Sequence, residues 1–392
     1  MMMDIDKFKV INDLYGMEKG NRILIDISRV IYNAMGEDDI CCRMYADIFC
    51  VLSKRSTEEE VSALIETIDR GLGDPRYESM LTANYGIVRV SDRAIPTGIW
   101  CEMAGYAHKA AKAHGIHHVA YYNANIRKET LRRKQIEREM REALQRGEFA
   151  VFLQPKYNTA EKRVVGAEAL ARWVHPHYGI LMPGEFIPLF EKNGFIIQLD
   201  LNIWEQTCQM LRRWMDEGKD VVPVSVNVSR LHFYNAQLKR QLLTLLDRYG
   251  IPGHLFHLEL TESLFAQDIQ SFSRITRELQ AAGLVLEMDD FGSGYSSLNM
   301  LQTIHVDVLK LDCGFFSEAV ISGRERIVLA HTIAMAKELD MDVVAEGVEN
   351  RQQMECLRQM GCQVIQGYYY SPPIPAREFE IQILTGGHDD VE

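Results

Sequence analysis

The chain has 392 residues, a formal net charge of −12 and 47% hydrophobic side chains, an ordinary globular composition. This length favours two domains, or one large barrel with an appendage, and the apolar content is ample for their cores. The negative charge argues against a nucleic-acid polymer as partner, and an anionic substrate requires local cations or metal ions.

The sequence predicts no membrane span, secretion signal or Cys/His metal site. No window approaches 18 uncharged apolar residues, and the opening MMMDIDKFKV has no basic region leading into an apolar one. The eight cysteines never form a CxxC pair, so we expect a reduced chain in the cytoplasm. Histidines 108, 114, 117 and 118 lack a closed ligand spacing, and we interpret that run as solvated surface.

A long helix is predicted over residues 127–146. The segment contains no Gly or Pro, and Ile136, Met140 and Leu144 recur every four positions. Its eight basic and four acidic side chains are typical of a solvated helix between domains. We prefer that interpretation to a stripe that binds nucleic acid.

From residue 149 onward, short apolar strands alternate with helical or turn segments. Helices are expected at 237–249, 268–282 and 324–339. Eight strands alternating with helices indicate a (β/α)8-type barrel. The strands read FAVFLQP, RVVGAEALARW, VPVSVNVS, LFHLELTES, LVLEMDD, VDVLKLD, DVVAEGVE and CQVIQGYYY.

Polar side chains stand where these strands are expected to end, and barrel active sites lie at the carboxyl ends of strands. Several converging carboxylates and an amide, without His or Cys, suit Mg²⁺ or Mn²⁺ better than zinc. Two such ions would neutralise the carboxylates, activate a water and stabilise an in-line attack on a phosphodiester. The predicted ring comprises Gln154, Glu168, Asn227, Glu259, Asp289, Asp290, Lys310, Glu346 and Gln366.

The doublet of Asp289 and Asp290 lies in EMDDFGSGYSSL, residues 287–298. Adjacent residues on a regular strand point to opposite faces, so both carboxylates reach one site only if the chain turns there. We expect the glycines of FGSG to allow that turn. An Asx turn after a buried strand would explain the glycines but not the doubled carboxylate.

Residues 135–385 resemble the EAL domain family of cyclic di-GMP phosphodiesterases. The resemblance implies a modified TIM barrel, expected over residues 148–386, whose first strand runs antiparallel to the rest. It also implies hydrolysis of cyclic di-GMP to a linear dinucleotide with two Mg²⁺ or Mn²⁺ ions, and a homodimer formed through this domain. It rests on seven motifs in family order, GAEALARW, SVNVS, ELTES, DDFGSGYSSL, VDVLKLD, AEGVE and QGYYYSPP.

The same resemblance implies a role for each site residue. Glu346, as metal ligand or general base, would act with Glu168 and with Lys310, which positions the attacking water. Glu262 would anchor the DDFGSGYSS loop. Arg172 suits phosphate because its fork donates two parallel hydrogen bonds. One metal is implied at Glu168, Asn227, Glu259 and Asp289, a second at Asp290, and substrate contacts at Gln154, Pro155, Leu170, Arg172 and Gln366.

Residues 1–124 resemble a degenerate GGDEF, or diguanylate cyclase, domain with an incomplete N-terminus, joined to the barrel by a linker helix at 125–147. The resemblance rests on DIDKFKVINDLYG, RMYADIFCVL and AGYAHKAAKAHG. Where the family has Gly-Gly-Asp-Glu-Phe, this chain has Tyr45, Ala46, Asp47, Ile48 and Phe49. Other functional positions are replaced by Asn21, Gly36 and Ile116, so no cyclase activity is expected. Binding of GTP stays open because the family residues Asp4, Asn12, Asp47 and Lys112 remain.

Two other functions stay open. A receptor that binds cyclic di-GMP without catalysis would pass a signal through the 127–146 helix, but it has no need of Asp289, Asp290, Lys310 and Glu346 together. Alternatively, the first domain binds GTP to regulate the second, or it serves only for dimerisation.

Overall fold

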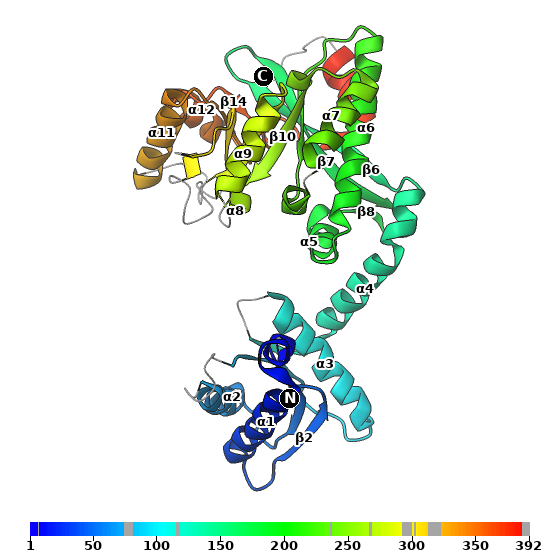
Figure 1. Cartoon of the computed structure of the whole chain (residues 1–392), viewed down its shortest axis with the longest axis vertical. Coiled ribbons are helices and arrows are strands. Elements are labelled where there is room, and N and C mark those ends of the chain that lie inside the picture. The colour runs from blue at the N-terminus through cyan, green and yellow to red at the C-terminus, as the bar shows by residue number, and fades with distance from the viewer. Residues whose placement is uncertain are drawn as a thin grey trace. The chain divides into compact units, whose positions relative to one another are not determined.

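The computed structural model describes two compact units, Met1–Arg138 and Glu139–Glu392 (Figure 1). Their division falls inside α4 (Ala124–Gln145), a helix where one was expected; the exact limits of the predicted domains stay predictions. No helix in the described ranges is long and apolar enough to cross a membrane. The described residues are 1–6, 8–73, 81–114, 118–235, 237–265, 269–291, 300–301, 303–312 and 323–385.

The first unit contains a five-stranded sheet in the order β2-β3-β1-β4-β5. Strand β1 is antiparallel to both neighbours, and β4 is parallel to β5. Its core lies where apolar residues of α1 and α2 pack on alternate residues of the central strands. The elements are β1 (Met2–Ile5), α1 (Phe8–Ala34), β2 (Ile40–Tyr45), β3 (Ile48–Leu52), α2 (Glu58–Leu72), β4 (Ala83–Ile87), α3 (Thr97–His114) and β5 (Val119–Tyr121).

Helix α3 lies directly on β4. A Cβ atom at Gly86 would stand 2.1 Å from the Ala104 carbonyl oxygen, so only glycine permits this approach. The approach buries His108 of α3, whose Nε2 lies 3.5 Å from Asp4 Oδ2. The interpretation of the histidine run as solvated surface is therefore wrong for His108, because a helix that packs this closely buries one face.

Eight strands of the second unit close into a barrel, as the sequence predicted. Strand β6 is antiparallel to both β7 and β14, and the other neighbouring pairs around the barrel are parallel. The expectation of a modified TIM barrel with an antiparallel first strand is confirmed. The strands are β6 (Phe149–Asn158), β7 (Arg163–His175), β9 (Val224–Asn227), β10 (Phe256–Thr261), β11 (Val285–Phe291), β12 (Val308–Leu311), β13 (Asp342–Ala345) and β14 (Val364–Ile365).

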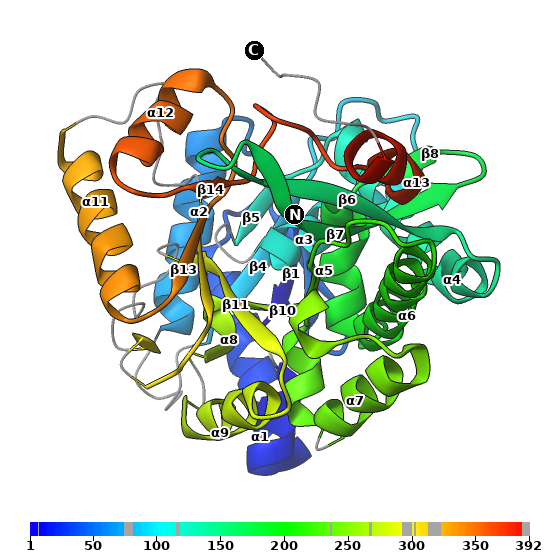
Figure 2. The same ribbon diagram turned by 90° about the horizontal axis from the view of Figure 1, so that it is seen from above.

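Helices surround the barrel strands, as Figure 2 shows for α6, α7, α9, α11 and α12. Helix α6 buries Leu199, Ile203, Leu211 and other apolar residues at helical spacing. Shorter strands β8 (Gly179–Leu181) and β15 (Ile374–Pro375) extend the sheet. The helices are α5 (Pro183–Asn193), α6 (Ile196–Asp216), α7 (Leu238–Tyr249), α8 (Glu262–Phe265), α9 (Ile269–Gln280), α11 (Gly323–Glu338), α12 (Arg351–Gln359) and α13 (Ala376–Phe379), with 3-10 turns at Arg230–Tyr234 and Gly253–Leu255 and a π turn at Glu380–Thr385.

Candidate active site

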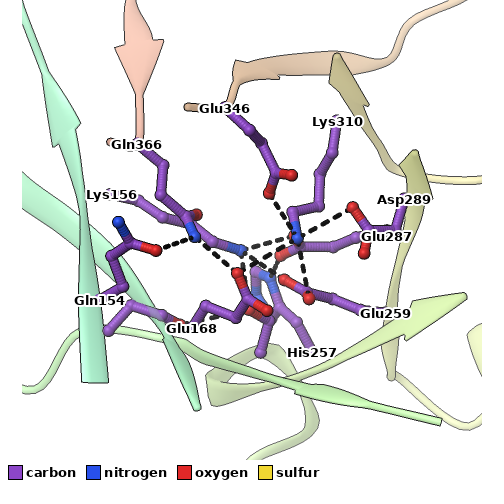
Figure 3. Close-up of polar contacts among 12 residues, drawn as sticks. Gln154, Lys156, Glu168, His257, Glu259, Glu287, Asp289, Lys310, Glu346 and Gln366 are labelled. Carbon is purple, nitrogen blue, oxygen red and sulfur yellow. Dashed lines mark hydrogen bonds and ion pairs between the residues drawn. The ribbon is translucent and has the colours of Figure 1, made fainter. Parts of the chain in front are cut away.

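Four carboxylates meet around one buried ammonium inside the barrel (Figure 3). The ammonium belongs to Lys310 on β12, whose side chain is 1% exposed. The carboxylates come from β7, β10, β11 and the residue that follows β13, so parallel strands bring their inward-facing side chains together. Lys310 Nζ lies 2.6 Å from Glu346 Oε1, 2.8 Å from Glu259 Oε2, 3.2 Å from Asp289 Oδ1 and 3.4 Å from Glu168 Oε2.

Two amide side chains also donate hydrogen bonds to the Glu168 carboxylate. Gln366 Nε2 donates to Glu168 Oε2 at 2.5 Å, and Asn227 Nδ2 donates to Glu168 Oε1 at 3.1 Å. Gln366 also donates to Gln154 Oε1 at 3.1 Å, and Gln154 in turn donates to the Ser371 carbonyl oxygen at 3.3 Å. The structure thus brings most of the predicted ring together, although the roles of its members stay predictions.

Two ring residues do not lie at strand ends, contrary to expectation. Gln154 and Glu168 lie inside β6 and β7, which have 10 and 13 residues. These long strands pair side by side, with Gln154 opposite Glu168. Because β6 is antiparallel, its carboxyl end lies at the other end of the barrel, and a residue within the strand reaches the site.

Asp290 breaks the regular alternation of β11. It has a positive φ of 57°, and the register between β11 and β12 shifts between Met288 and Phe291. Its backbone N–H donates to Asp289 Oδ1 at 2.9 Å. The chain therefore turns at the doublet itself, while Gly292 and Gly294, which were expected to allow the turn, lie outside the described residues.

A second buried cation, Lys156 on β6, was not predicted. Its Nζ lies 2.6 Å from Glu287 Oε2, 3.2 Å from Glu259 Oε1 and 2.8 Å from Ser225 Oγ. His257 Nδ1 lies 2.7 Å from the other Glu287 oxygen. The sequence did contain a signal for its partner Glu287. Glu287 precedes Asp289 by two residues and therefore lies on the same face of the strand.

The site carries more carboxylates than ammonium groups, and this shifts their pKa values. Burial and the neighbouring Glu259 raise the pKa of Glu168 to about 7. Burial, assisted by Asp289 and Glu168, raises the pKa of Glu346 well above its usual value despite the opposing effect of Lys310. Burial alone would lower the pKa of Lys310, but the carboxylates, Glu168 foremost, raise it well above normal. Negative charge is therefore in excess.

This donor set fits divalent cations. Carboxylate and amide oxygens are the ligands that Mg²⁺ and Mn²⁺ prefer, and the raised carboxyl pKa values indicate a shortage of positive charge. In the described part of the chain, no three His, Cys, Asp or Glu side chains already surround a metal position. The carboxylates point at the Lys310 ammonium instead.

The remaining predicted barrel residues lie on β6, β7 and α8. Pro155 is buried on β6, whereas Leu170 on β7 is half-buried. Arg172 is buried, with its guanidinium carbon 5.8 Å from the centre of the Phe152 ring. Glu262 is buried at the first residue of α8, and most of the loop that it was predicted to anchor lies outside the described residues.

The first unit retains a small polar group at the predicted nucleotide positions. Lys112 Nζ lies 3.0 Å from Asp4 Oδ1, and burial and Asp4 raise the pKa of Asp47. Ala46 stands where the family motif has glycine and adopts a φ of 46°, which is unfavourable for a residue with a Cβ. Ile116 lies outside the described residues.

Comparison with protein families agrees with the barrel fold of the second unit. The family model described as the EAL domain matches residues 137–373. The chain belongs to the EAL domain family. A second family model, described as the diguanylate cyclase GGDEF domain, matches residues 1–118 and precedes the EAL domain.

Individual relatives align with nearly the whole length of this chain. The bifunctional diguanylate cyclase/cyclic di-GMP phosphodiesterase MucR of Pseudomonas aeruginosa is 31% identical over 383 residues, which are 96% of this chain and 56% of MucR. The cyclic di-GMP phosphodiesterase NbdA of the same organism is 32% identical over 384 residues, 97% of this chain and 49% of NbdA. The chain thus spans about half the length of these relatives.

Solved structures resemble the EAL domain of this chain. A structure described as the PaMucR phosphodiesterase in complex with c-di-GMP is 35% identical, covers 62% of this chain and 99% of that chain, and has a TM-score of 0.60. The EAL domain of Mycobacterium smegmatis DcpA is 26% identical, with the same two coverages and a TM-score of 0.52.

Proposed function

We propose that the EAL domain hydrolyses cyclic di-GMP to the linear dinucleotide pGpG and requires Mg²⁺ or Mn²⁺. The proposal rests on the four carboxylates around Lys310 in a chain of the EAL family. The similarity to MucR, whose phosphodiesterase structure contains c-di-GMP, supports the substrate. A receptor without catalysis is the alternative, and it has no use for this complete set of charged residues.

In the proposed reaction, one water adds to phosphorus, the ester bond to the ribose 3′ oxygen breaks, and that oxygen takes up a proton and leaves as a hydroxyl. Glu168, Asn227, Glu259 and Asp289 would hold one divalent ion and Asp290 a second, which would activate the water and stabilise charge on the phosphate. Lys310 offsets the repulsion among the carboxylates and orients the water. Glu346, whose Oε1 atom lies 2.6 Å from Lys310 Nζ, would accept the proton of that water. Substrate contacts are assigned to Gln154, Pro155, Leu170, Arg172 and Gln366.

For the first domain we propose a regulatory or dimerisation role without cyclase activity. The isoleucine at position 48 cannot replace the charge of a glutamate, and Ala46 stands where the family has glycine. GTP binding is compatible with the Asp4, Asp47 and Lys112 group. We further propose a homodimer formed through the EAL domain, and a cytoplasmic location in keeping with the free cysteines among the described residues.

The deciding experiment is incubation of the purified chain with cyclic di-GMP and either Mg²⁺ or Mn²⁺, followed by chromatography of the products. We expect pGpG, and no product in the presence of EDTA. Binding without turnover in both metals would establish the receptor instead. A parallel incubation with GTP should give no cyclic di-GMP, and its detection would refute the proposed loss of cyclase activity.

A further inference from the structure

Lys156 and Lys310 share one carboxylate between them. Glu259 is fully buried, with its Oε1 atom 3.2 Å from Lys156 Nζ and its Oε2 atom 2.8 Å from Lys310 Nζ (Figure 3). Each oxygen of this carboxylate therefore has its own ammonium partner. We propose that Lys156 is a positioning residue that fixes Glu259 for metal binding, an inference that rests on the proposed function.

The pairing of β10 with β11 explains why the Oε1 atom of Glu259 needs a nearby cation. Glu259 on β10 is the direct neighbour of Glu287 on β11, and both side chains are buried inside the barrel. Two adjacent buried carboxylates repel each other strongly without a cation between them. Lys156 supplies that cation, because its Nζ contacts one oxygen of each carboxylate.

Lys156 is itself held in place from several strands. An ammonium has three N–H donors, and here they face Ser225 Oγ, Glu259 Oε1 and Glu287 Oε2. The other oxygen of Glu287 lies 2.7 Å from His257 Nδ1, and His257 Nε2 lies 3.0 Å from the His254 carbonyl oxygen. Strands β6, β9, β10 and β11 thus contribute to one fixed orientation of Glu259.

Loss of Lys156 would remove one of the two ammonium groups that contact Glu259. Glu259 Oε1 would lose its ammonium partner, so the carboxylate would be held only through Oε2 by Lys310 and would no longer have one fixed orientation. Outer hydrogen-bond partners of metal ligands commonly contribute about 10–100-fold to metal affinity. We expect an effect of that size on the affinity for Mn²⁺.

The test uses the metal-free full-length chain and measures Mn²⁺ binding by electron paramagnetic resonance together with the melting temperature. Lys156→Met should lower both the Mn²⁺ affinity, by about 10–100-fold, and the melting temperature. In Lys156→Met/Glu287→Leu, the repulsion between Glu259 and Glu287 is gone, so the melting temperature should recover. Glu259 Oε1 still lacks its ammonium partner, so the Mn²⁺ affinity should stay low. The exposed Lys192→Met on α5 controls for the loss of one positive charge.

The outcomes separate this inference from the function on which it rests. The positioning role of Lys156 would be overturned if Lys156→Met bound Mn²⁺ as tightly as the wild type does. It would also be overturned if the double variant recovered Mn²⁺ affinity together with stability. Either result would leave the metal site itself intact. If the single variant does not fold, the double variant alone decides. A wild-type chain that binds no Mn²⁺ would overturn the metal-dependent function and this inference with it.

Discussion

Replacement of Lys310 by methionine tests how the candidate site is held together. Methionine has a similar length but no charge, so Lys310→Met leaves three buried carboxylates and the half-buried Glu346 without the ammonium that they surround at 2.6–3.4 Å. The structure predicts a less stable EAL domain in the absence of metal, and a variant that gains more stability from divalent cations than the wild type does.

The size of this effect follows from the distances. At an effective dielectric constant of about 20, one pair of unit charges about 3 Å apart contributes about 5 kcal/mol, before the cost of burying both groups. After that cost, removal of one partner from a buried ion pair typically lowers the free energy of unfolding by about 3–5 kcal/mol. Proton uptake by Glu168 and Glu346 limits the loss further. For a unit of this size, the melting temperature should fall by about 10 °C.

The assay is thermal unfolding of wild type, Lys310→Met and the exposed Lys192→Met at pH 7.5, each with EDTA and with excess Mg²⁺. Lys192→Met should match the wild type in both conditions. Mg²⁺ should raise the melting temperature of Lys310→Met by several degrees more than that of the wild type, since the ion supplies the missing charge. If Lys310→Met had the same melting temperature as Lys192→Met in EDTA, the idea that Lys310 holds the carboxylates together would be refuted.

Three further predictions concern the same site. Asp289→Asn or Glu346→Ala should lower turnover of cyclic di-GMP by several orders of magnitude, and near-normal rates in either would show that the residue is misassigned. Because the pKa of Glu168 is raised from 4.5 to about 7, the stability that its protonated form contributes is lost as pH rises through that range. The metal-free chain should therefore lose unfolding free energy between pH 4.5 and pH 8; chemical denaturation at a series of pH values measures this, and a flat profile contradicts it. Glu262→Ala should leave the fold intact but raise the Mg²⁺ concentration for half-maximal rate; a loss of stability with an unchanged metal requirement would indicate a helix cap instead.

The barrel was predictable because its strands and helices can be recognised from short segments of the sequence. Short apolar runs such as those around Glu259 and Lys310 alternate with amphipathic segments, and this pattern alone indicates a barrel. The antiparallel direction of β6 was expected only from the family resemblance. The inward position of Glu168 also follows from period-two alternation. Its place within a long strand does not, because the lengths of β6 and β7 are set by their pairing with each other and with neighbouring strands.

The contact between Lys156 and Glu287 could not be predicted from the sequence. The two residues are 131 positions apart, and their contact depends on how β6 and β11 are arranged across the barrel. No local pattern marks Lys156 as buried, since lysine is usually exposed. Burial of His108 escaped prediction for the same reason, because its partner Asp4 lies on a distant strand.

The antiparallel strand β6 has a consequence for how a ribosome produces this molecule. Its partner β14 lies about two hundred residues later, with Tyr157 opposite Ile365. The first unit has its own core and is synthesised earlier, so it can acquire structure while the barrel is still an open sheet. Lys310 is translated before Glu346 and Gln366. The barrel can close only after β14 has left the ribosome and paired with β6. Under the proposed function, a nascent chain therefore cannot hydrolyse cyclic di-GMP before β14 has been translated and paired with β6.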